Sequence, residues 1–235
     1  MMDIKGILFD SGDTLVYPKS GSWWPGPEFE SILLRHGINV SQFEPNTMRI
    51  ALEKGQGYLN ANHLVANLEE EMAQFRTYYQ IICNRLGINK YEQLTKELAR
   101  AYVEECNFIL YPDTVPALET LANDGKTLGV LADAWPSLHN KYITLGIRHY
   151  FKSFTVSAEV GCCKPDEQIY RRAIDEIGIE SKNLLFVDDD TENVKAAIRL
   201  GMNGIVMLRN RGIEEGEVPF AMDLHDILNY LARGE

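Results

Sequence analysis

Acidic residues cluster directly after two short apolar runs of this sequence. The segment FDSGDTL (Phe9–Leu15) closes the first run, and the segment DDDTEN (Asp188–Asn193) follows the second. If both runs are strands of one sheet, their carboxylates converge in one cleft, where they repel each other strongly unless a cation lies among them. Clustered carboxylate oxygens with few other ligands suit Mg²⁺, which keeps several waters and also binds substrate phosphates.

A lysine lies between these two acidic segments. Lys164 precedes Pro165, a residue that can begin a helix. A lysine beside the carboxylates could neutralise a carboxylate nucleophile and a phosphoryl group in transfer. Each feature also has a plain structural interpretation: Asp188–Asp190 could cap the helix that follows, and a Lys-Pro pair is often a solvated loop.

Five apolar runs predict buried strands. They are Ile4–Phe9, Thr127–Leu131, Phe154–Ser157, Leu184–Val187 and Gly204–Leu208. Segments of helical period lie between the later runs and end at Gly125, Gly178 and Gly201. This alternation predicts an α/β fold with a parallel sheet between helices. In such a sheet the ligand site lies beyond the carboxyl ends of the strands, where the acidic segments follow.

The stretch from about Val16 to Ile109 interrupts this alternation. Apolar residues recur there at steps of three and four from Leu64 to Leu86, and Gly87 follows as a helix stop. Asn67 and Glu70 can form a capping box at the start of that helix. We therefore predict a core domain of residues 1–16 and 110–235 with an inserted all-helical domain of residues 17–109.

The composition limits the partners of the protein. Its 235 residues carry 23 Lys and Arg against 34 Asp and Glu, a formal net charge of −11, so nucleic acids and anionic membranes are poor partners. No apolar stretch approaches the roughly 18 residues of a membrane span, and the first residues do not resemble a secretory signal. The four cysteines show no CxxC spacing. We expect a cytoplasmic monomer or homodimer that acts on a small molecule.

In order and spacing, the segments resemble the haloacid dehalogenase-like (HAD) hydrolase superfamily over nearly the whole chain. The match comprises FDSGDTL, ADAWPSL (Ala132–Leu138), SAEVGCCKPDEQIY (Ser157–Tyr170) and LLFVDDDTENVKAAIRLGM (Leu184–Met202). The resemblance implies a HAD-like Rossmannoid core. The helical insertion resembles the C1-type cap of subfamily I, which closes over the site and selects the substrate.

The resemblance assigns roles to individual residues. It implies that Asp10 is the nucleophile, which forms an aspartyl-phosphate, and that Lys164 contacts both the nucleophile and the phosphate. It implies that Mg²⁺ is the cofactor and is bound by Asp10, the backbone carbonyl of Gly12, Asp189 and Asn193.

Four other positions receive lesser roles. Thr14 is expected mainly to brace the loop after the nucleophile, on the substrate side of the site. The backbone N–H groups of Asp133 and Ala134 are expected to bind phosphate at the start of the next helix. Asp188 stands where many family members have glycine, and we expect it to act at most behind the metal ligands.

Two positions depart from the family pattern. Gly12 stands where most family phosphatases have the Asp that protonates the leaving oxygen, and Asp13 follows one place later. A positioned acid contributes about 10²- to 10⁴-fold in rate. Either Asp13 reaches the site despite its shift, or the leaving group departs unprotonated, or turnover is slow. Ala132 replaces a Ser or Thr whose hydroxyl holds a phosphate oxygen, a hydrogen bond worth ~1.5–3 kcal/mol.

The sequence therefore predicts a Mg²⁺-dependent phosphatase of small phosphorylated metabolites. Alternatives stay open. One alternative within the resembled superfamily is a haloacid dehalogenase, which also lacks the second Asp. Dehalogenases of that superfamily use no Mg²⁺ and have no comparable acidic run, unlike this sequence. Gly12 and Ala132 together suggest a weakened enzyme retained as a binding or regulatory module. Phosphomutase chemistry, or phosphonate chemistry with Lys54 or Lys90 as the cap lysine, is less favoured.

Overall fold

The chain forms two compact units in the computed structural model, which describes residues 3–89, 91–209 and 218–233. The first unit comprises Met1–Tyr17 and Phe108–Glu235, and the second comprises Pro18–Asn107. Both acidic segments belong to the first unit. No helix in the described part of the chain is long and apolar enough to cross a membrane.

A six-stranded parallel sheet forms the centre of the first unit, in the order β5-β4-β1-β6-β7-β8. The strands are β1 (Gly6–Phe9), β4 (Thr127–Ala132), β5 (Phe151–Val156), β6 (Leu184–Asp188), β7 (Asn203–Met207) and β8 (Phe220–Ala221). Phe9 pairs with Val130 and with Val187, so β1 ends level with both of its neighbours. The prediction of an α/β fold with a parallel sheet is confirmed.

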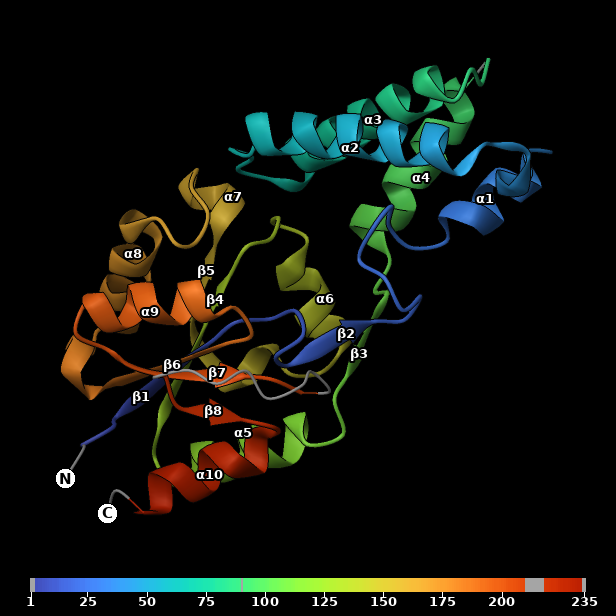
Figure 1. Ribbon diagram of the computed structural model, residues 1–235. Helices are drawn as coiled ribbons and strands as arrows, with labels where there is room; N and C mark the ends of the chain where they lie inside the picture. The colour runs from blue at the N-terminus through green and yellow to red at the C-terminus, as the bar shows by residue number, and fades with distance from the viewer. Residues whose placement is uncertain (1–2, 90, 210–217, 234–235) are drawn as a thin grey trace. The chain divides into compact units, whose positions relative to one another are not determined.

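Helices cover both faces of this sheet (Figure 1). α8 (Glu167–Ile177) packs on β4 and β5, and α9 (Thr191–Arg199) packs on β6 and β7. On the other face α5 (Thr114–Asn123) packs on β4 and against α10 (Leu224–Arg233). The shorter helices are α6 (Leu138–Thr144), α7 (Ser157–Val160), η2 (Arg148–Tyr150) and η3 (Ser181–Asn183). The predicted helix-ending glycines adopt left-handed φ angles, 71° at Gly178 and 84° at Gly201.

The second unit is built from α1 (Phe29–Arg35), α2 (Pro45–Ala61), α3 (Leu68–Arg85) and α4 (Glu92–Glu104), with a short helix η1 (Val40–Gln42). α3 packs against both α2 and α4. Its start has the predicted cap, because Asn67 Oδ1 accepts the Glu70 N–H at 3.0 Å. Glu70 Oε2 in turn accepts the N–H of Ala66 at 2.8 Å. Leu64 precedes the helix and is 68% exposed, so the buried stripe begins later than its periodicity predicts.

Strands are shifted by three residues or are additional to the sequence prediction in three places. β5 begins at Phe151 rather than Phe154, because it is an edge strand in which exposed Lys152 interrupts the apolar run. Short strands β2 (Val16–Pro18) and β3 (Phe108–Leu110) pair with each other at the ends of the segment predicted to be wholly helical. The third is β8, whose two residues are too few to give a periodic pattern.

Candidate active site

Three acidic residues meet at the carboxyl end of the central strands. The N–H of Asp10 donates to the Val187 carbonyl at 2.8 Å, so the ladder of β1 and β6 continues one residue beyond Phe9. Asp188 is the last residue of β6, and Asp133 follows the last residue of β4. Because β4 and β6 flank β1, the fold brings these carboxylates to the same edge of the sheet.

The ammonium group of Lys164 bridges two of these carboxylates. Its Nζ donates to Asp10 Oδ1 at 2.5 Å and to Asp188 Oδ2 at 2.6 Å. The side chains are 2% exposed for Lys164, 10% for Asp10 and 1% for Asp188, so both ion pairs are buried. The backbone N–H of Lys164 donates to Asp133 Oδ1 at 3.0 Å, which fixes the loop that carries the lysine.

Asp188 is also held by the segment that follows β6. Its Oδ1 accepts the N–H of Asp190 at 2.8 Å, and Asn193 Nδ2 lies 3.2 and 3.3 Å from its two oxygens. The carbonyl of Asn193 accepts the hydroxyl of Tyr170 at 2.9 Å. Asp190 caps α9 through its side chain, as the structural interpretation of the acidic run predicts for one of its members. Asn193 therefore lies within the cluster, in contact with Asp188.

Burial and neighbouring charges together set the pKa values of the cluster. Burial raises the pKa of Asp10 well above its usual range; Lys164 opposes this, while Asp188 and Asp189 raise it further. Burial lowers the pKa of Lys164, but Asp10, Asp188 and Asp133 outweigh it, so this pKa lies above its ordinary value. Burial raises the pKa of Asp133 as well. Four carboxylates thus share one ammonium, and the cluster has an excess of negative charge.

This donor set fits a hard divalent cation. The ligands predicted from the sequence, Asp10, Asp189, Asn193 and the Gly12 carbonyl, would supply only oxygen atoms, which Mg²⁺ prefers. A divalent cation would also offset the charges of Asp188 and Asp189, which add to burial in raising the pKa of Asp10.

The nucleophile loop, residues 10–16, folds back on itself. The N–H groups of Leu15 and Val16 both donate to the Ser11 carbonyl, at 2.9 and 3.1 Å. Asp13 is half-buried and adopts a φ of 52°, a left-handed conformation that costs a residue with a side chain about 1 kcal/mol. Thr14 is fully buried, and its hydroxyl has no hydrogen-bond partner in the described structure. This placement favours loop bracing over substrate contact for Thr14.

The predicted phosphate site at Asp133 and Ala134 is not formed at a helix start. α6 begins only at Leu138, because a turn at residues 136–137 separates it from β4. The N–H of Ala134 donates to Ser157 Oγ at 2.9 Å. The carboxylate of Asp133 accepts the Lys164 N–H. The expected helix start at these residues is therefore wrong, whereas phosphate binding by their backbone N–H groups stays a prediction.

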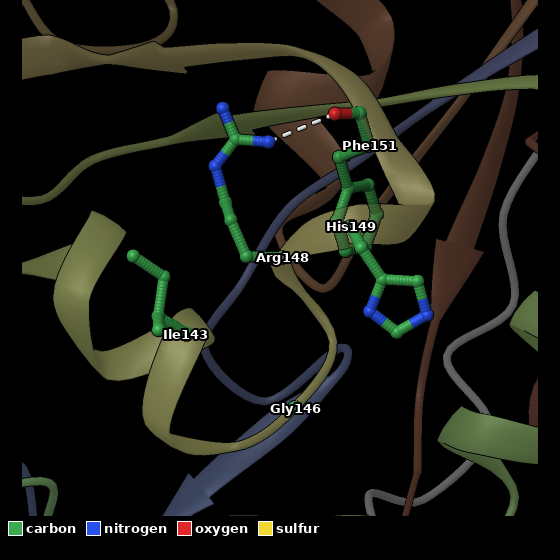
Figure 2. Close-up of a pocket in the computed structure, with 5 residues that line it drawn as sticks. All are labelled: Ile143, Gly146, Arg148, His149 and Phe151. Carbon is green, nitrogen blue, oxygen red and sulfur yellow. Dashed lines mark hydrogen bonds between the residues drawn. The ribbon is translucent and has the colours of Figure 1, made fainter.

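A separate hollow of about 430 Å³ lies at the amino end of β5 (Figure 2). It is lined by Ile143, Gly146, Arg148, His149 and Phe151. Arg148 Nη1 donates to the Phe151 carbonyl at 2.8 Å, so this guanidinium is engaged by the strand. Phe151 begins β5, whereas the acidic cluster lies at the carboxyl ends of the strands. The hollow is therefore not part of the cluster.

The sequence was compared with models of known protein families to determine which family it belongs to. A family model described as haloacid dehalogenase-like hydrolase matches residues 4–201. The chain belongs to this family. The match includes the four segments on which the resemblance rests, except the last residue of the fourth, so the expectation of a HAD-like hydrolase is confirmed.

Individual HAD relatives extend over the whole chain. The glyceraldehyde 3-phosphate phosphatase of Methanopyrus kandleri is 24% identical over 249 residues, which cover 98% of this chain and 99% of the relative. A HAD phosphatase structure from Thermococcus onnurineus has a TM-score of 0.66 and 21% identity, covering 97% of this chain and 98% of the other. A 2-haloacid dehalogenase structure from Pseudomonas syringae has a TM-score of 0.68 and 19% identity, covering 99% and 100%. These structural likenesses show the shared fold.

Asp188 and Asp133 are the residues that sequence reasoning underestimates. Asp188 contacts Lys164 directly, although its position predicts at most a role behind the metal ligands. The sequence does contain a signal for the burial of Asp188, because this residue directly follows an apolar run and is the last buried residue of β6. No sequence feature indicates that Asp133 fixes the Lys164 loop, because 31 residues separate the two partners.

Replacing the bridging lysine should destabilise the protein strongly. In metal-free buffer, Lys164→Met should lower the free energy of unfolding by about 3–5 kcal/mol, because two buried carboxylates then face each other without a cation. Lys195→Met removes a lysine that is 47% exposed, and should cost less than about 0.5 kcal/mol. Urea unfolding followed by circular dichroism measures both. Equal losses for the two variants would contradict the buried bridge.

Proposed function

We propose that this HAD-like hydrolase is a Mg²⁺-dependent phosphatase of small phosphorylated metabolites, with Asp10 as its nucleophile. The observation that carries the proposal is the buried bridge of Lys164 between Asp10 and Asp188, within a cluster that has excess negative charge. A carboxylate held by an ammonium beside a metal-binding set of oxygens suits attack on a dianionic phosphate.

The residues divide the chemistry between them. A carboxylate oxygen of Asp10 attacks phosphorus, and the bond to the ester oxygen breaks, while Lys164 holds the carboxylate through Oδ1 at 2.5 Å. Asp13 donates a proton to the leaving oxygen and then accepts one from the water that attacks the aspartyl-phosphate. That second attack releases inorganic phosphate and restores Asp10. When bound by Asp10, Asp189 and the Gly12 carbonyl, Mg²⁺ offsets the negative charge of the phosphate.

The relatives support a small phosphorylated substrate. A glyceraldehyde 3-phosphate phosphatase matches nearly the whole chain, and a phosphoserine phosphatase from Thermus thermophilus is 29% identical over 52% of it. Both names describe phosphate esters of small metabolites, and we propose the same class of substrate here. We also propose that the helical unit, Pro18–Asn107, acts as the cap that selects the substrate.

Dehalogenation is the second candidate, because dehalogenase structures share this fold and Gly12 removes the usual proton donor. The acidic cluster favours phosphatase chemistry. A metal-free dehalogenase gains nothing from Asp188 and Asp189 beside its nucleophile, since both raise the pKa of Asp10 and so disfavour its nucleophilic form.

Removing the nucleophile should abolish phosphate release. Asp10→Asn should lower kcat at least ~10³-fold with Mg²⁺ and p-nitrophenyl phosphate or a panel of small metabolite phosphates, because an amide cannot form the covalent intermediate. Asp175→Asn, an exposed change on α8, serves as the matched control and should keep wild-type activity. A wild type inactive on the whole panel would contradict the proposal, as would an Asp10→Asn variant that keeps a tenth of the activity.

Metal dependence separates the two candidate activities. Chelation should abolish phosphate release and Mg²⁺ should restore it, whereas a dehalogenase would release halide from 2-haloacids without metal. By calorimetry, Asp189→Asn should weaken Mg²⁺ binding roughly 10-fold or more. The control Asp190→Asn should bind Mg²⁺ like the wild type, because asparagine retains the cap that Asp190 forms with the Glu192 N–H. Equal weakening by both variants would exclude Asp189 as a specific ligand.

The role of Asp13 can be isolated with two leaving groups. Asparagine tolerates the left-handed φ of 52°, so Asp13→Asn removes only the acidic proton. The variant should lose about 10²-fold or more in kcat with an alkyl phosphate, whose leaving oxygen needs a proton. With p-nitrophenyl phosphate, whose leaving group departs unprotonated, it should lose much less in kcat/KM, which reports the first step and not the hydrolysis of the aspartyl-phosphate. An unchanged kcat on the alkyl ester would exclude Asp13 as the acid.

A further inference from the structure

Arg209 contacts the nucleophile loop although 195 residues separate it from Thr14. It follows β7, and its side chain is only 8% exposed. Its Nε donates to the Thr14 carbonyl at 3.1 Å, and its Nη2 donates to the same oxygen. Thr14 lies four residues after Asp10, on the returning half of the nucleophile loop. One guanidinium edge thus binds the backbone of that loop.

Asp113 fixes the other edge of the guanidinium. Arg209 Nη1 donates to Asp113 Oδ1 at 2.9 Å and to Oδ2 at 2.7 Å. The same carboxylate accepts the N–H of Leu224 at 2.7 Å, so it is itself held by the first residue of α10. The guanidinium carbon lies 3.9 Å from the centre of the Tyr111 ring. Only a planar fork can make all these contacts at once, because a lysine has a single ammonium centre.

The next carbonyl of the loop is also held from outside. Thr114 Oγ1 donates to the Leu15 carbonyl at 2.8 Å, and the N–H of Tyr111 donates to the same oxygen at 3.2 Å. Two consecutive carbonyls, those of Thr14 and Leu15, are therefore bound by groups outside the loop. These contacts restrain the segment that carries Asp10 and Asp13.

The backbone of Arg209 adopts a strained conformation. Its φ is 50°, in the left-handed region that residues other than glycine and asparagine rarely adopt. Strain of this kind persists where surrounding contacts determine it, and often at functional sites. Arg209 also lies outside residues 4–201, which the family model matches.

We infer that Arg209 is a positioning residue, which holds the nucleophile loop through the Thr14 carbonyl so that Asp10 and Asp13 keep their places. Arg209 binds the loop backbone, so it acts on the reaction through Asp10 and Asp13. The inference rests on the proposed role of Asp10, because only then does the loop conformation set a reaction rate. A displacement of the loop of about 1 Å is enough to cost 10²-fold in rate.

Two measurements on the full chain test this inference. The first is hydrogen–deuterium exchange of a peptide that covers residues 10–17, which needs no turnover. The second is kcat and KM for p-nitrophenyl phosphate with Mg²⁺. The variants are Arg209→Met and Arg209→Lys, with Arg171→Met as the control, since the Arg171 side chain is 66% exposed on α8. Circular dichroism establishes that each variant is folded.

Arg209→Met should speed exchange in residues 10–17 and lower kcat about 10- to 100-fold, with KM changed less than about 3-fold. Arg209→Lys should recover only part of both losses, and Arg171→Met should match the wild type. Unchanged loop exchange in Arg209→Met would overturn the inference, as would faster exchange throughout the core unit. Faster loop exchange in a chain whose wild type releases no phosphate would support the restraint and refute the proposed function.

Discussion

The buried ammonium of Lys164 is the interaction on which the candidate site depends. Asp10 and Asp188 end neighbouring parallel strands, so the fold places two carboxylates where they repel each other in a low-dielectric environment. Lys164 offsets that repulsion, because its Nζ lies 2.5 Å from Asp10 Oδ1 and 2.6 Å from Asp188 Oδ2. One positive charge does not balance four carboxylates, and the remaining negative charge is what makes the site suitable for a divalent cation. Sheet topology and site chemistry are therefore linked through this residue.

The nucleophile loop shows how one exchange of residues changes a family motif. Gly12 stands where most HAD phosphatases have their acid, and Asp13 stands next to it in a left-handed conformation. A carboxylate at that position pays a conformational cost that glycine would avoid, which favours a role for the Asp13 side chain. Restraint of the loop at the Thr14 carbonyl by Arg209 fits the same interpretation, because a shifted acid works only if its backbone is held in place.

Much of the fold and part of the site can be predicted from the sequence. The five apolar runs give the central strands, because buried parallel strands are continuously apolar. The convergence of Asp10 with the second acidic segment follows from the rule for ligand sites in such sheets. The sequence does not show which Asp of that segment contacts Lys164, because Asp188 and Asp189 have the same side chain. The end of β6 decides that Asp188 is the buried one.

Contacts between segments that are distant in the sequence cannot be predicted from hydrophobic periodicity or local motifs. Arg209 and Thr14 are 195 residues apart, and no periodicity links them. The start of α6 is set by a local feature, because Pro136 disfavours helical backbone at the residue before it. The prediction that a helix starts at residues 133–134 is therefore wrong, although β4 itself is predicted almost to the residue.

Covalent phosphorylation of Asp10 is tested most directly by trapping the intermediate. The enzyme is quenched during turnover of a phosphate ester and treated with borohydride, which reduces an acyl-phosphate to an alcohol. Peptide mass spectrometry then locates the modified residue. We predict that Asp10 is converted to homoserine only when substrate is present. Reduction at another carboxylate, or an unmodified Asp10 in an enzyme that is turning over, would contradict it.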